Sequence, residues 1–159
     1  MKPMTPAVRK NIQKYIKNGL DISELIQGYT LANEDLSGAK IRKFNRSNDN
    51  LRGLNISRCV IGAPGVINNG SGSDWRGSKW CDTVVDGIFY LRRCDARDAD
   101  FSGMVAINAE YQYTDFRGAK FCETCMRIGS EYGFKAKFDE SLFKDWSRGW
   151  NLEITVKED

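Results

Sequence analysis

The side chains of this 159-residue chain that are best suited to chemistry are its five cysteines, because it contains no histidine. Cys122-Glu-Thr-Cys125 has the spacing of half a zinc site, but neither a second such pair nor a histidine is present to complete four ligands. We therefore predict no metal and no cofactor, with a metal or redox role for this pair as the alternative. Packed or surface thiols are expected at all five positions, which are Cys59, Cys81, Cys94, Cys122 and Cys125.

The missing histidine also removes the Ser-His-Asp and Cys-His arrangements that many enzymes use near neutral pH. Carboxylates are plentiful, with Asp95, Asp98 and Asp100 close together, but aspartate recurs at one place in a short repeated phrase and so belongs to its architecture. No glycine-rich phosphate loop of the P-loop or dinucleotide type occurs. The sequence therefore predicts a protein that is not an enzyme.

The repeated phrase has five residues. It reads Ser-Asp-Trp-Arg-Gly at 73–77, Ala-Asp-Phe-Ser-Gly at 99–103 and Thr-Asp-Phe-Arg-Gly at 114–118, and weaker copies lie at 34–38 and 49–53. A period of five matches neither the 3.6 residues of a helical turn nor the two of a strand, so the backbone must turn at every repeat. The sequence therefore predicts a solenoid.

The phrase resembles that of the pentapeptide-repeat family: a small residue, then Asp or Asn, a central Leu or Phe, a polar residue and often Gly. The resemblance implies an all-β solenoid over residues 31–146, a right-handed quadrilateral β-helix with four pentapeptides to a coil. It places the central residue, and the small residue two positions before it, inside the coil. The expected centres are Leu36, Ile41, Arg46, Leu51, Ile56, Ile61, Val66, Trp75, Trp80, Val85, Phe101, Ala106, Tyr111, Phe116, Phe121, Met126, Phe138 and Phe143.

Residues 1–30 are expected to form a helical N-terminal cap. Thr5 followed by Pro6 is typical of a helix start, and Asn18-Gly19 of a helix end. Asp21 with Glu24 three residues later has the spacing of a capping box, which predicts a short second helix ending at Gly28. Such helices would shield the first coil from edge pairing.

Two regions interrupt the repeat and are the candidates for partner recognition. The stretch 66–74 resets the register and is expected to be an inserted loop, whose candidate partner-binding residues are Asn68, Asn69 and Ser71. After Phe143 the phrase dissolves into a C-terminal tail at 147–159, which ends in a short alternating strand. Here Trp146 and Trp150 are candidates for a plug over the last coil or for an interface.

The net charge of +3 is carried by the first 30 residues, while the rest of the chain holds as many acidic as basic residues. The resemblance suggests one alternative, a DNA gyrase or topoisomerase modulator of the quinolone-resistance kind, but an imitation of DNA needs a surplus of negative charge. We therefore predict a non-catalytic protein-interaction or structural module that binds a protein partner or self-associates. Direct nucleic-acid binding is not expected.

The N-terminus lacks the apolar run of a secretion signal, and no stretch approaches the ~18 apolar residues of a membrane span. A cytoplasmic or virion-associated protein is expected.

Overall fold

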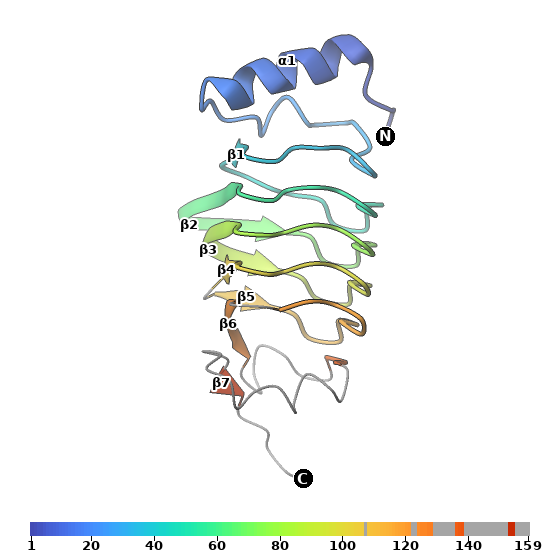
Figure 1. Ribbon diagram of the computed structural model, residues 1–159, viewed down its shortest axis with the longest axis vertical. Coiled ribbons are helices and arrows are strands. Elements are labelled where there is room, and N and C mark those ends of the chain that lie inside the picture. Colours follow the sequence, from blue (N-terminus) through green and yellow to red (C-terminus); the bar gives the residue numbers. More distant parts are fainter. Residues whose placement is uncertain (107, 122–123, 129–135, 139–152, 155–159) are drawn as a thin grey trace.

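The computed structural model describes residues 1–106, 108–121, 124–128, 136–138 and 153–154, and it places one helix above a stack of coils (Figure 1). The helix α1 spans Pro6–Lys17. The strands are β1 (Lys40–Ile41), β2 (Val60–Asn69), β3 (Val84–Tyr90), β4 (Val105–Ala106), β5 (Ala109–Glu110), β6 (Cys125–Ile128) and β7 (Glu153–Ile154). Among the described residues, no helix has the length and apolar character needed to cross a bilayer.

Successive coils pair in parallel. The strands follow the order β1-β2-β3-β4-β6-β7, and β5 pairs with β3 beside β4. Isolated parallel bridges continue the stacking on other sides of the coil, for example from Asn50 to Asp74, Asp95 and Asp115 in turn. A residue in one coil therefore lies above its counterpart in the next, so side chains far apart in sequence form columns.

The corners of the coil explain the aspartate and glycine of the repeat. At many of the described corners an Asp or Asn accepts a hydrogen bond from the backbone N–H two residues later, as Asp35 does from Ser37 at 2.9 Å. The corners also use left-handed backbone, which glycine and asparagine adopt most easily. In one such column Asn48 (φ 56°) stands directly before Gly72 (φ 71°), and a Cβ on Gly72 would lie 2.2 Å from the Asn48 Oδ1.

The core is a continuous column of central side chains. Trp75 and Trp80 are fully buried, with ring centroids 4.7 Å apart, and Trp80 continues to Phe101 at 5.6 Å. Most predicted centres are confirmed as buried; Val66 and Phe138 are half-buried, and Met126 and Phe143 lie outside the side chains that the structure describes. Phe89 and Leu91 are buried as well, although the repeat phrase did not predict them as centres.

Small residues beside the centres link neighbouring coils. Thr83 Oγ1 donates to the Ile56 carbonyl at 2.6 Å, and the Cys59 thiol occupies an equivalent place, 3.2 Å from the Leu36 carbonyl. A hydroxyl or thiol in this position donates to a backbone carbonyl inside the coil, and it is small enough to fit beside the large central side chain. The predicted packing role of Cys59 is therefore confirmed.

The helix α1 begins and ends as predicted. Thr5 is its N-cap, with Oγ1 accepting from the Val8 N–H at 3.3 Å, and Gly19 follows its end in left-handed conformation (φ 64°). The second helix was predicted wrongly, because residues 23–28 form turns. Asp21 accepts from the Ser23 N–H at 2.9 Å, as the corner aspartates of the coils do, so it starts a repeat-like turn instead of capping a helix.

Arg46 fixes this N-terminal segment to the stack. Its guanidinium is 7% exposed, donates to the carbonyls of Ile26 and Tyr29, and pairs with Asp49 at 3.2 Å. The predicted centre at position 46 is thus inside the coil, but it serves polar groups there. Without Arg46 the Tyr29 carbonyl would lose this donor, and the Ile26 carbonyl would keep only the Tyr29 N–H, at 3.4 Å.

The insertion lies earlier than the predicted loop at 66–74. Strand β2 continues to Asn69, and the register shift falls between Gly62 and Ile67, whose partners Asp86 and Ile88 have only Gly87 between them. Residues 63–66 stand opposite this single residue and form a bulge whose Ala63 and Val66 carbonyls lie over Gly87, where a Cβ would approach them to 2.6 and 2.5 Å. Residues 67–69 are therefore part of the sheet.

Candidate binding groove at one corner of the coils

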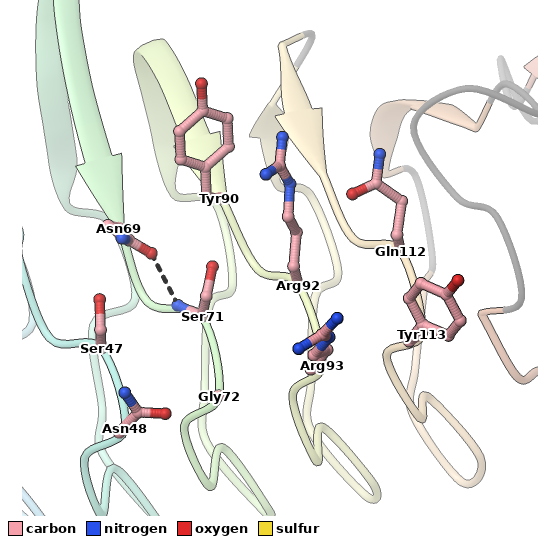
Figure 2. A pocket seen from close by; sticks show the side chains of 10 residues that line it. All are labelled: Ser47, Asn48, Asn69, Ser71, Gly72, Tyr90, Arg92, Arg93, Gln112 and Tyr113. Carbon is pink, nitrogen blue, oxygen red and sulfur yellow. Dashed lines mark hydrogen bonds between the residues drawn. The ribbon is translucent and has the colours of Figure 1, made fainter.

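A groove of about 610 Å³ runs across one corner of four successive coils (Figure 2). Its first half is lined by glycine and short polar residues, namely Ser47, Asn48, Asn69, Ser71 and Gly72. Asn69 ends β2, and its Oδ1 accepts from the Ser71 N–H at 3.0 Å, which is the corner turn of the repeat. The structure thus brings two of the predicted partner-binding residues, Asn69 and Ser71, to one groove.

Asn68 must be corrected as a candidate. It is fully buried, because its alternate position on β2 turns its side chain into the coil. Its Oδ1 accepts from the Phe44 N–H at 2.8 Å, and its Nδ2 lies 3.4 Å from the Ile88 carbonyl. Asn68 is a structural link between coils and does not line the groove.

The second half of the groove carries long side chains. These are Tyr90, Arg92, Arg93, Gln112 and Tyr113. The Arg92 guanidinium lies 4.4 Å from the centroid of the Tyr90 ring, and that of Arg93 lies 5.9 Å from the centroid of the Tyr113 ring. Arg92 also pairs with Glu110 of the following coil, with Nε 2.9 Å from Oε2. Arg93 and Tyr113 continue the corner column that contains Asn48 and Gly72.

These larger residues were missed at the sequence level. The repeat phrase tolerates any polar residue after the centre, so Arg92 and Gln112 looked like ordinary repeat positions. Tyr90 and Tyr113 come together with them only when the coils stack, as Figure 2 shows. One signal was present in the sequence: Arg93 and Tyr113 replace the Asn or Gly that a left-handed corner favours.

The other predicted interface residues, Trp146 and Trp150, lie outside the described residues, as does Cys122. Self-association through the C-terminal tryptophans therefore stays a prediction. The short strand predicted within the tail is present at β7, which pairs in parallel with β6 through Arg127 and Glu153.

Charge along a second side of the rod is neutralised pair by pair. Asp74, Asp95 and Asp115 stand in one column, and each accepts two hydrogen bonds from the arginine two residues later, such as Arg97 to Asp95 at 2.8 and 2.7 Å. Hydrogen bonding by Arg97 holds the pKa of the Asp95 carboxyl below its usual value. These described aspartates therefore do not form a continuous acidic face.

The described thiols do not suggest a reactive centre. Cys59, Cys81 and Cys94 are free, and burial raises the pKa of the Cys59 and Cys94 thiols to about 11. Within the part of the chain that the structure describes, no group of three or more His, Cys, Asp or Glu residues could hold a metal ion.

The stacked parallel coils and their turn chemistry define a β-solenoid. A family model described as Pentapeptide repeats matches residues 90–126 in eight copies. The resemblance to the pentapeptide-repeat family is thereby confirmed, and this segment consists of pentapeptide repeats. It includes Tyr90, Arg92, Arg93, Gln112 and Tyr113 of the groove.

No curated protein matches this chain. Among solved structures, the chain is similar to QnrB1 in a trypsin-treated form, described as a plasmid-mediated fluoroquinolone resistance protein. The two share 15% sequence identity, the alignment covers 79% of this chain and 87% of that chain, and the TM-score is 0.21. So low a TM-score supports no conclusion about a shared partner.

Proposed function

We propose that this protein is a non-catalytic protein-interaction module, a right-handed quadrilateral β-helix with a helical N-terminal cap, which recognises a protein partner at the corner groove. The observation that carries the proposal is the groove itself. Its lining changes from Asn48 and Gly72 to Arg93 and Tyr113 along one column, and so gives a repetitive rod one distinctive surface. Conserved geometry with variable surface residues is how solenoids present binding surfaces.

The chemistry of the described residues supports a binding role over a catalytic one. The described thiols Cys59 and Cys94 are buried with raised pKa values, and the aspartates of the second side are held as carboxylates by arginines. Neither set offers an activated nucleophile or a general base near neutral pH. We infer no substrate turnover.

The charge pattern favours this role over the alternative of a gyrase modulator that imitates DNA. Such a mimic needs negative charge along a face, whereas Arg76, Arg97 and Arg117 each pair with an aspartate of the same coil. We expect no effect on gyrase supercoiling.

Site-specific photo-crosslinking in the native host tests the proposal. Ser71 lines the groove, and Ser57 is a matched control at another corner, because each N–H donates to an asparagine two residues earlier, at 3.0 Å from Asn69 and 3.1 Å from Asn55. A benzophenone amino acid at position 71 should give a discrete protein adduct, and the same group at position 57 should not. Equal adducts at both positions, or none at 71, would contradict the proposal.

A further inference from the structure

The lining of the groove has one sign of charge. Arg92 and Arg93 are cationic, and the remaining lining residues are neutral hydrogen-bonding or aromatic residues, with no carboxylate among them. A second hollow of about 250 Å³ shows the contrast. It is lined by Arg52 together with the carboxylate of Asp98, and its Arg76 and Arg97 are paired with Asp74 and Asp95. In the corner groove Arg92 is paired with Glu110 in the same way, so Arg93 is the lining cation whose attraction for an anion no ion pair among the described residues uses.

Arg93 is the cation with capacity for a ligand. Arg92 is held by Glu110 and by the Tyr90 ring, whereas among the described residues Arg93 forms no ion pair and is exposed over the Tyr113 ring. A guanidinium that lies over a ring keeps its N–H edge available, and that edge fits a carboxylate through two parallel hydrogen bonds. Tyr113, 49% exposed, offers a flat surface beside it.

The backbone at this corner sets where the two long side chains lie. Arg93 (φ 56°) and Tyr113 (φ 61°) adopt the left-handed conformation in successive coils, which is disfavoured for residues with long side chains. Both side chains are exposed, so burial in the core does not offset this strain. Arg58 shares the conformation (φ 57°) but does not line the groove, and so provides a control.

We propose that the corner groove binds a carboxylate-bearing peptide segment, anchored by Arg93 and flanked by Tyr113. This inference rests on the proposed function and names the chemistry of its partner. A peptide fits better than a nucleic acid, because Arg93 is one cation and matches one carboxylate, whereas a nucleic-acid backbone is bound by a series of cations. Asn69 and Ser71 supply polar groups suited to a peptide backbone, and about 610 Å³ is the size of an ordinary ligand site.

Fluorescence anisotropy with a labelled hexaglutamate peptide tests this inference, with Arg93→Gln as the variant and Arg58→Gln as the matched control. The parent should bind saturably, Arg93→Gln should weaken binding at least about fivefold, and Arg58→Gln should stay within about twofold. Raising NaCl from about 50 to 300 mM should weaken binding further. Circular dichroism melting of both variants checks that each remains folded.

Several outcomes would overturn the inference. They are the absence of saturable binding by the parent up to millimolar peptide, equal losses in both variants, and tighter binding of a labelled oligothymidylate than of hexaglutamate. Crosslinking at Ser71 distinguishes failure of the carboxylate inference from failure of the groove as a partner site. An adduct at Ser71 with no hexaglutamate binding would keep the groove as the partner site and reject the carboxylate, whereas failure of both would reject the proposed function as well.

Discussion

Arg46→Met tests how the N-terminal segment is joined to the coils. The guanidinium is 7% exposed, pairs with the buried Asp49 at 3.2 Å, and donates to the carbonyls of Ile26 and Tyr29. Methionine keeps the apolar stem but leaves the carboxylate and both carbonyls without this donor. Breaking a buried ion pair from one side costs about 3–5 kcal/mol, which is a large part of the ~5–15 kcal/mol of a typical domain.

Denaturant unfolding followed by the fluorescence of the buried Trp75 and Trp80 measures this change. A double variant, Arg46→Met with Asp49→Ala, separates the two contributions. Removing the unpaired carboxylate should recover at least about 1 kcal/mol relative to Arg46→Met alone, while the lost hydrogen bonds to the Ile26 and Tyr29 carbonyls keep the double variant below the parent. A loss under about 1 kcal/mol in Arg46→Met would refute the reasoning, as would a double variant that is no more stable than the single one.

Three further predictions concern corners, carboxylates and thiols. By denaturant unfolding, Gly77→Ala should lower the free energy of unfolding by about 1–2 kcal/mol, because its φ of 63° is disfavoured for alanine although the space around it is open. Gly118→Ala (φ 75°) should lower it more, because the added Cβ would lie 2.2 Å from a carboxylate oxygen of the preceding coil. Hydrogen bonds from Arg97 lower the pKa of the Asp95 carboxyl in the folded protein. The pair therefore stabilises the fold at pH values above the usual carboxyl pKa, and this stabilisation is lost as the pH falls through the lowered pKa of the folded state. NMR titration should therefore show a higher Asp95 pKa in Arg97→Gln, and an unchanged value would reject the pairing. Cys94, with a thiol pKa near 11, should resist iodoacetamide at pH 7.5 in the folded protein and react after unfolding, as mass spectrometry can show.

The sequence predicted the coil interior well, because the repeat fixes which side chain turns inward. Trp75, Trp80, Phe101 and Phe116 are buried as expected. The same rule placed Arg46 at a centre. Only the structure shows the two carbonyls to which its guanidinium donates.

The insertion was misplaced for a physical reason. Asn-Asn-Gly-Ser-Gly has the composition of a loop, but Asn68 replaces apolar packing by two hydrogen bonds inside the coil. The true bulge contains Pro64, which has no N–H to give to a neighbouring strand, and Gly65 with φ 75°. Ala-Pro-Gly was the better turn signal.

The groove could be predicted only in part. Asn69 and Ser71 were chosen for the irregularity of their segment, and the structure places both in the lining. Tyr90, Arg93 and Tyr113 join them through stacking of separate coils, and a single sequence without the register does not reveal such a column.

The most direct test of partner recognition at this corner is a footprint of the complex. Amide hydrogen exchange of the protein, alone and with the partner captured by crosslinking, reports where the partner protects the backbone. The proposal predicts slower exchange at residues 69–72 and 90–93, with little change at residues 55–58 of another corner. Protection confined to residues 55–58 or to the α1 helix, with residues 69–72 and 90–93 unaffected, would contradict it.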